Sequence, residues 1–374
     1  LREILIEVEF ENGVTTVGEY AFYLCSKIAE ITLGPSITSI GNYAFSGCSK
    51  LTTITLSEGL LTIGQQAFYN HGGLQSITIP TTVTTISSQA FATATKSINK
   101  IIYNGTKEPS TCATNAFTSS QGTSIVDVLI TYESEIFCGL TPQTSGSCKD
   151  DSTSCHYTYN HQTFIMQIEG TGRMQEYNSL EEVPWNKKNS KISTLTIGTT
   201  LQSIGNYAFK NAISYPSLSI PSSITSIGTD SFYNNDKITT LTLHKDISTI
   251  GTNAFSYNEK LETIKYEGTK NPCSGDAFTD SKAKTVEVPI NYIDSLFCGL
   301  TPMTTGGSCG SGCTWSYNHK DKKLLITGGT MTEFSTISEV PWKDQITNIT
   351  TVEIQTTMNV GSNAFNGATS LESV

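Results

Sequence analysis

Ten cysteines are the residues of this sequence best suited to chemistry, because their number and spacing fit either a metal site or disulfides. Eight of them form two equivalent sets of four, whereas Cys25 and Cys48 stand apart and are expected to be small buried hydrophobic residues. A zinc site usually contains closely spaced cysteine pairs, and only Cys309 and Cys313 approach that spacing. Disulfides are therefore favoured over zinc. The eight residues are Cys112, Cys138, Cys148, Cys155, Cys273, Cys298, Cys309 and Cys313.

Four cysteines allow three disulfide connectivities, and the sequence alone does not choose among them. We favour the pairs that lie nearest in each local segment, and closing a loop of about 26 residues would contribute about 3 kcal/mol by chain entropy. Disulfides persist in oxidising compartments, so they indicate an extracellular or cell-surface location. Sequons at Asn104 and Asn348 would be glycosylation sites in a secreted protein. The favoured pairs are Cys112–Cys138, Cys148–Cys155, Cys273–Cys298 and Cys309–Cys313.

The five histidines show no catalytic or metal-binding spacing such as His-Glu-x-x-His. His161 and His319 both end a Tyr-Asn-His sequence, which indicates a shared structural role in a turn. The chain contains no Gly-x-Ser-x-Gly elbow and no glycine-rich loop followed by Lys-Ser or Lys-Thr. The sequence therefore predicts a protein that is not an enzyme and that has no cofactor and no metal.

The composition narrows the class of partner. The 374 residues carry a formal net charge of −10, and only 15% of them are charged. No basic stripe is therefore available to neutralise nucleic-acid phosphates. No apolar run reaches the roughly 18 residues that a membrane helix needs, so we expect no membrane insertion of this chain. Both ends of the sequence fall inside a repeated motif, and we expect a fragment of a longer protein whose export signal or anchor lies elsewhere.

A repeat of 23 residues supplies the elements that position these side chains. In each repeat a segment such as residues 51–56, Leu-Thr-Thr-Ile-Thr-Leu, alternates between apolar and polar side chains, which predicts a short strand. An Ile-Gly pair then turns the chain, and an Ala-Phe pair follows, with Ser231 replacing one alanine. One such unit cannot close a core alone, so the units must stack as coils of a solenoid. The repeated phenylalanines are Phe22, Phe45, Phe68, Phe91, Phe209, Phe232, Phe255 and Phe278.

The frame Leu-x-x-Ile-x-Ile-Pro…Ile-Gly-x-x-Ala-Phe-x-x-Cys is nearly complete over residues 44–68, and it resembles the BspA-type leucine-rich repeat. The resemblance covers about two thirds of the chain. The sequence departs from this frame three residues after the phenylalanine, where the cysteine of the frame (Cys48) is replaced in other repeats, for example by His71 and Asn235. The resemblance implies a repeat solenoid of mainly short parallel β-strands and turns, with short helical segments on the convex side and inserted β-hairpins.

Two inserts interrupt the repeats, and Phe-Cys-Gly-Leu-Thr-Pro begins both of them at an offset of 160 residues. An alternating apolar run after each Asn-His predicts a β-hairpin. Trp185 and Trp342 follow, and we expect each to fill the place of the phenylalanine in the first coil of the next array, so that the insert caps or bridges the solenoid. The predicted division is array 1 at 1–137, an insert at 138–190, array 2 at 191–297, an insert at 298–345 and a truncated third array at 346–374.

The outward positions of the predicted strands form a row on the concave face that is mostly hydroxyl-bearing and has no aromatic anchor. This row could bind extended protein or glycan weakly, although threonine is also simply a good strand residue. Tyrosines beside the repeated phenylalanines are the aromatic candidates on the convex side, and they are Tyr20, Tyr23, Tyr43, Tyr69, Tyr207 and Tyr233. We call the row the ladder residues: Thr32, Thr55, Thr78, Thr196, Ser219, Thr242 and Lys265.

The family resemblance implies a secreted or surface adhesin that binds protein ligands such as host extracellular-matrix or cell-surface proteins. A structural spacer or stalk within a surface protein is one alternative, and a glycan-binding module is another. Fold alone does not decide among them.

Overall fold

The computed structural model describes residues 6–93, 98–118, 125–148, 155–355 and 358–374. The chain forms two compact units, of which the first comprises Leu1–Gly146 with Thr158–Ile165 and the second comprises Ser147–Tyr157 with Met166–Val374. No helix among the described residues is long and apolar enough to span a membrane.

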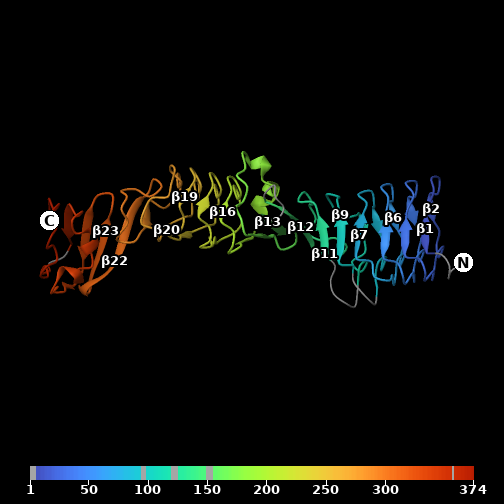
Figure 1. Ribbon diagram of the computed structural model, residues 1–374, viewed down its shortest axis with the longest axis horizontal. Coiled ribbons are helices and arrows are strands. Elements are labelled where there is room, and N and C mark those ends of the chain that lie inside the picture. The colour runs from blue at the N-terminus through green and yellow to red at the C-terminus, as the bar shows by residue number, and fades with distance from the viewer. Residues whose placement is uncertain (1–5, 94–97, 119–124, 149–154, 356–357) are drawn as a thin grey trace. The chain divides into compact units, whose positions relative to one another are not determined.

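The first unit is a stack of coils in which two rows of parallel strands follow the stack, and the row of longer strands is divided between two sheets (Figure 1). The longer strands are β1 (Glu7–Glu9), β3 (Glu30–Thr32), β5 (Thr53–Thr55), β7 (Ser76–Ile79), β9 (Lys100–Tyr103), β11 (Ile125–Val128) and β12 (Pro142–Ser147). The shorter ladder contains β2 (Thr16–Val17), β4 (Ser39–Ile40), β6 (Thr62–Ile63), β8 (Thr85–Ile86) and β10 (Thr111–Cys112). Successive coils pair in register, with Ile31 opposite Ile54 and Ile40 opposite Ile63.

The second unit repeats this plan. Its shorter ladder is β16 (Ser203–Ile204), β17 (Ser226–Ile227) and β19 (Thr249–Ile250). Its longer parallel strands are β15 (Thr194–Ile197), β18 (Thr240–Leu243), β20 (Thr263–Tyr266), β21 (Thr285–Glu287) and β26 (Thr351–Ile354). The insert adds the antiparallel strands β22 (Thr301–Ser311), β23 (Cys313–Asn318), β24 (Lys323–Thr327) and β25 (Thr330–Met331). The equivalent strands of the earlier insert are β13 (Cys155–Asn160) and β14 (Ile165–Gly170).

The core of each unit contains a column of stacked phenylalanines. In the first unit, the ring centroids of Phe45 and Phe68 lie 5.3 Å apart with nearly parallel planes. In the second unit, the rings of Phe232 and Phe255 also lie 5.3 Å apart. All four side chains are fully buried, so each repeat contributes one ring to a continuous apolar column, as the 23-residue period requires.

Trp185 and Trp342 occupy the expected places at the start of such a column. The ring of Trp185 stacks on Phe209 at 5.9 Å, and its Nε1–H donates to the carbonyl oxygen of Ala208 at 2.8 Å. Trp342 makes the same contacts with Phe365 and Ala364, at 5.8 Å and 2.9 Å. Both tryptophans are fully buried. Each insert is therefore fixed to the coil that follows it through the core.

The expected helical segments beside the Ala-Phe pairs are turns instead. Regular helix in the described residues is restricted to four short 3₁₀ segments in the inserts, which are η1 (Leu180–Glu182), η2 (Asn186–Lys191), η3 (Ile337–Glu339) and η4 (Lys343–Gln345). The reason lies in the backbone, because residues two before and two after the phenylalanine adopt positive φ, as at Gln66 (52°) and Asn70 (59°). Alternate N–H groups then donate to the next coil, for example from Phe68 to Ala90 at 2.8 Å. This conformation is incompatible with a continuous right-handed helix.

The parallel coils, buried phenylalanine column and inserted hairpin establish a repeat solenoid. The finer five-part division into arrays and inserts stays a prediction.

Candidate interaction surface

All seven ladder residues are exposed to solvent. In the first unit Thr32 lies directly opposite Thr55, and in the second unit Thr242 lies opposite Lys265. Within each strand the neighbour of the ladder residue points inward, as Ile54 does beside Thr55 with 8% exposure. The strand period of two therefore places one polar side chain per coil on the outside. We call the surface that these residues form in each unit the strand face of that unit.

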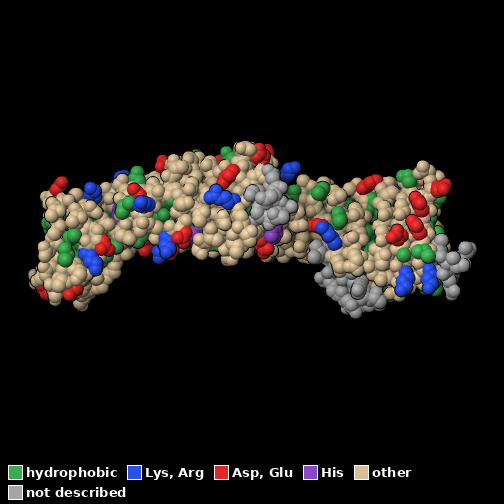
Figure 2. Space-filling view, in the orientation of Figure 1, with side chains coloured by type: hydrophobic (Ala, Val, Ile, Leu, Met, Phe, Trp, Pro, Cys, Tyr) green, Lys and Arg blue, Asp and Glu red, His purple; other side chains and the backbone are tan. Residues whose placement is uncertain are grey.

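Charge is sparse on the molecule, and the face seen in Figure 2 shows charged side chains scattered among uncharged ones. Within the strand face, Lys265 is the charged ladder residue. Its neighbour in register on β21 is Glu287, which is also exposed. Glu9 on β1 is also exposed and lies in register with Thr32, so the strand face carries a few charges of both signs among its uncharged polar groups.

Two hollows lie in the strand face, one in each unit. The first hollow has a volume of about 260 Å³ and is lined by residues 52–56 and 75–78. The second hollow has a volume of about 330 Å³ and is lined by residues 218–220 with Ser222, Thr240, Thr242 and His244. Four ladder residues take part, Thr55 and Thr78 in the first hollow and Ser219 and Thr242 in the second. The sequence pattern placed these residues on one face but gave no indication of the hollows.

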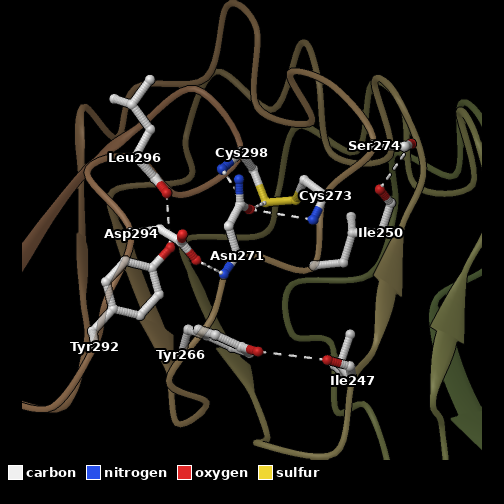
Figure 3. The surroundings of a disulfide bond; sticks show 10 residues. All are labelled: Ile247, Ile250, Tyr266, Asn271, Cys273, Ser274, Tyr292, Asp294, Leu296 and Cys298. Atoms are coloured by element: carbon white, nitrogen blue, oxygen red, sulfur yellow. Dashed lines mark hydrogen bonds between the residues drawn. A yellow bond between two sulfur atoms is a disulfide. The ribbon is translucent and has the colours of Figure 1, made fainter.

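The four disulfides of the structure join the pairs that the local spacing favours, namely Cys112–Cys138, Cys148–Cys155, Cys273–Cys298 and Cys309–Cys313. Figure 3 shows the third of these bonds, where the side-chain oxygen of Asn271 accepts hydrogen bonds from the N–H groups of both Cys273 and Cys298 at 3.2 Å. The Asp294 carboxylate accepts from the Asn271 N–H at 2.6 Å. Asn271 and Asp294 thus hold the main chain around the Cys273–Cys298 disulfide by hydrogen bonds.

At the equivalent disulfide of the first unit, Cys112–Cys138, the Glu108 carboxylate accepts a hydrogen bond from the Cys138 N–H. Glu108, Cys112 and Cys138 are the single group of three potential metal ligands among the described residues. The two sulfurs are bonded to each other and cannot act as thiolates. The arrangement is therefore a disulfide with a supporting carboxylate. Cys25 and Cys48 are free and buried, as expected.

His161 and His319 are buried and share one environment, which the sequence did not reveal. The Nε2 atom of each lies 2.8 Å from a threonine Oγ1, of Thr144 and Thr304 respectively. The main-chain N–H of each donates to a proline carbonyl, so both residues hold the hairpin in place. Burial lowers the pKa of His319 to about 4, and a hydrogen bond with the main chain of Tyr292 opposes this shift. The ring of His319 is therefore neutral at physiological pH.

Tyrosines beside the phenylalanine column form small exposed clusters. Tyr20 is 49% exposed and stacks on Tyr43 with centroids 4.9 Å apart. In the second unit, the Lys210 ammonium lies 4.3 Å from the ring centroid of Tyr233 and 2.6 Å from the Asp230 carboxylate. Stacked rings cover each other's faces, so these clusters present edges and hydroxyl groups to a partner. The sequon residues Asn104 and Asn348 are both exposed.

Comparison with known proteins identifies the repeat. A family model described as "BspA type Leucine rich repeat region" matches residues 3–124 and 187–298 in six copies, which together span more than half of the chain. No curated protein matches the chain.

Solved structures of other repeat proteins are similar to this one at low identity. A leucine-rich repeat protein from Bacteroides ovatus is 15% identical, with 98% of this chain and 85% of that chain covered and a TM-score of 0.29. The pneumococcal vaccine antigen PcpA is 20% identical over 77% of this chain and 82% of its own, with a TM-score of 0.28. A leucine-rich repeat protein from Eubacterium ventriosum is 16% identical over 79% and 72%, with a TM-score of 0.26.

Proposed function

The chain belongs to the BspA type leucine rich repeat family, and from this premise we propose that it is a non-enzymatic, extracellular or cell-surface interaction protein of the adhesin kind. Its strand face binds protein ligands, such as host extracellular-matrix or cell-surface proteins. The observation that supports the proposal is the set of exposed, mostly hydroxyl-bearing ladder residues that each unit presents on its longer strands. Where neighbouring strands are paired, these residues offer hydrogen bonds at a spacing of about 4.8 Å.

The disulfides support the location. Four bonds occur in a chain of 374 residues, and disulfides persist in secreted and surface proteins rather than in reducing compartments. Two of the bonds join an array to the insert that follows it, and the other two lie within the inserts.

Binding of the purified, oxidised protein to immobilised matrix proteins and to cells tests this function. The informative variant is Thr242→Lys, which places a charge on the strand face of the second unit. The matched control is Thr249→Lys, because Thr249 is also an exposed strand threonine but belongs to the shorter ladder. We expect saturable binding that Thr242→Lys weakens and Thr249→Lys preserves.

Absence of saturable binding to every matrix protein and cell type would refute the adhesin function and favour the spacer. Binding that both variants weaken equally would show that the strand face is not the surface used. A panel of immobilised glycans in the same assay separates protein recognition from glycan recognition.

A further inference from the structure

Each array is joined to the insert that follows it by one disulfide, and the two bonds are equivalent. The first junction bond is Cys112–Cys138, and the second junction bond is Cys273–Cys298. In both bonds the second cysteine is buried, whereas the first cysteine is partly exposed. One chain therefore contains two copies of the same bond, and a difference in their chemistry must come from the side chains around them.

The two disulfides inside the inserts are less accessible than the junction bonds. Exchange of a disulfide begins when a thiolate reaches one of its sulfurs, so it depends on access to that sulfur. In the folded protein a small thiol can therefore reach the junction bonds at Cys112 and Cys273, but it cannot reach the bonds inside the inserts. The cysteines of those buried bonds are at most 1% exposed, and they are Cys148, Cys155, Cys309 and Cys313.

A side-chain oxygen holds the buried cysteine of each junction bond, but the charge of that side chain differs between the two bonds. The Cys138 N–H donates to the Glu108 carboxylate, and the Cys298 N–H donates to the side-chain oxygen of Asn271 at 3.2 Å. Glu108 and Asn271 occupy the same position in a repeated Gly-Thr-Lys-x-Pro sequence. The two bonds therefore have matching hydrogen bonds and differ by one negative charge at this position.

The negative charge at the first junction bond lies beside both sulfurs. One carboxylate oxygen of Glu108 and the two sulfurs all lie within 4.8 Å of one another. At the second junction bond the corresponding atom is the neutral side-chain oxygen of Asn271, 3.7 Å from the Cys298 sulfur (Figure 3). Among the residues that the structure describes, no carboxylate forms so compact a group with the two sulfurs of the second junction bond.

Carboxylates also lie near the second junction bond, but they are placed differently. The Asp294 carboxylate accepts from the Asn271 N–H at 2.6 Å, at the position where the Ser134 hydroxyl accepts from the Glu108 N–H at 3.2 Å. The charged and the neutral group have thus exchanged places between the two units. The carboxylate of the exposed Asp276 lies beside the glycine that follows the buried cysteine. Because solvent screens a charge more strongly as its distance grows, these carboxylates affect the sulfurs less than Glu108 does.

The position of the charge affects the reduction of each bond. A thiolate that attacks the sulfur of Cys273 forms a mixed disulfide with it, and the bond to Cys298 breaks so that the Cys298 sulfur leaves as a thiolate. A second thiolate then attacks the mixed disulfide, which releases the oxidised reductant and the Cys273 thiolate, and both cysteine thiolates take up protons from water. A carboxylate beside the sulfurs repels the incoming thiolate and disfavours the negative charge on the leaving sulfur, so it slows the reaction.

We propose that the second junction bond, Cys273–Cys298, is the redox-sensitive disulfide of this protein, and that Glu108 protects the equivalent bond of the first unit from reduction. The reaction partner is a small thiol reductant. Its attack removes the covalent tie between the second array and the insert that follows, while the other three disulfides stay oxidised. This inference goes beyond the proposed function, because it concerns regulation of the fold and requires no ligand on the strand face.

Timed reduction of the intact, oxidised protein tests the proposal. The protein is incubated with 2-mercaptoethanol at several concentrations, samples are stopped with acid at intervals, and the free thiols are alkylated and located by peptide mass spectrometry. We expect the second junction bond to be reduced about five- to tenfold faster than the first, which is the effect of one unit charge at this distance after screening by solvent. The rate should rise in proportion to the thiol concentration, as attack on the folded protein requires, and the bonds inside the inserts should stay oxidised.

Two substitutions exchange the charges of the junction bonds and keep the size and the hydrogen-bond acceptor of each side chain. Glu108→Gln should accelerate reduction of the first junction bond to about the rate of the second, and Asn271→Asp should slow reduction of the second by about the same factor. Glu133→Gln is the matched control, since Glu133 is an exposed carboxylate near the first junction bond that pairs with Lys107 at 3.3 Å. It should leave both rates unchanged, and urea midpoints of the oxidised variants check that each one is folded.

The charge of the thiol and the salt concentration separate electrostatics from access. Added salt should bring the two reduction rates closer together, because it screens the carboxylate. Cysteamine, whose ammonium group is attracted by Glu108, should also bring them closer together than 2-mercaptoethanol does. A difference in access alone would respond to neither change.

Equal rates of reduction for the two junction bonds of the unmodified protein overturn the proposal, and so does faster reduction of the first. A difference that remains in Glu108→Gln and is insensitive to salt overturns the role of the charge. Reduction of all four disulfides together, at a rate independent of thiol concentration, also overturns it, because the thiol would then act only after the fold has opened.

Discussion

Replacement of Trp185 measures how strongly an insert is fixed to its array. The side chain is fully buried, stacks on Phe209 and donates a hydrogen bond to Ala208. Removing a buried tryptophan side chain leaves a large cavity, so Trp185→Ala should lower the free energy of unfolding by about 3–5 kcal/mol. Trp185→Phe keeps a stacking ring and loses the N–H donor. Because Asn189 still donates to the Ala208 carbonyl, at 3.5 Å, that variant should cost about 1 kcal/mol.

Urea titration followed by circular dichroism gives the overall loss of stability, and hydrogen exchange at the Phe209 and Asn211 amides locates it. These amides donate to the next coil, to Ser231 and Tyr233, so they exchange faster if the coil beside the tryptophan opens. Tyr257→Ala is the control, since that ring is 43% exposed. A cost below about 1 kcal/mol for Trp185→Ala, within the range of surface substitutions, would refute the view that the tryptophan fixes the insert through the core.

Three further outcomes follow from the structure. Removing the bond of Figure 3 with Cys273→Ser and Cys298→Ser should lower stability by about 3 kcal/mol, given its loop of 25 residues, and an unchanged urea midpoint would contradict this. Because burial lowers the folded-state pKa of His319 to about 4, below its ordinary value of 6.5, the unfolded state takes up the proton first. The His319 contribution is then complete above pH 6.5 and is lost as the pH falls toward 4, and His319→Phe should flatten this part of the stability profile. Alkylation after unfolding without reductant should modify two cysteines, Cys25 and Cys48, whereas ten modified cysteines would exclude the disulfides.

The 23-residue period was sufficient to predict the stack of coils, because a single strong constraint acts on every copy. Phe68 and Phe91 must meet if each coil places its ring at the same height, and they do so at 5.1 Å. The same logic extended to Trp185, which stands before an array and one residue ahead of the position where the period would place a phenylalanine. Burial of large apolar side chains at fixed intervals is thus readable from sequence alone.

The backbone conformation of the segments around the Ala-Phe pairs could not be predicted in this way. Gln66 and Asn70 adopt left-handed conformations, which favour glycine and are uncommon for other residues, so these turns stand where the family resemblance implied short helical segments. Inter-coil hydrogen bonds offset the cost of these conformations, and they exist only once the coils are stacked. The partner of His161 was hidden for a related reason, since Thr144 precedes it by 17 residues and reaches it through the hairpin.

Departures from the repeat show where one coil differs structurally from its neighbours. A residue that obeys the frame contributes to stability in every coil, and its role is therefore the same throughout. Pro216 and the Gly72-Gly73 pair break the frame at the coils whose ladders are interrupted, and a hollow lies at each interruption. Pro216 lacks the N–H that its counterparts Thr52 and Glu262 donate to the preceding coil. Pro216→Thr should therefore raise the urea midpoint by restoring one inter-coil donor, worth about 1 kcal/mol, and an unchanged midpoint would show that the missing N–H does not account for the absent strand.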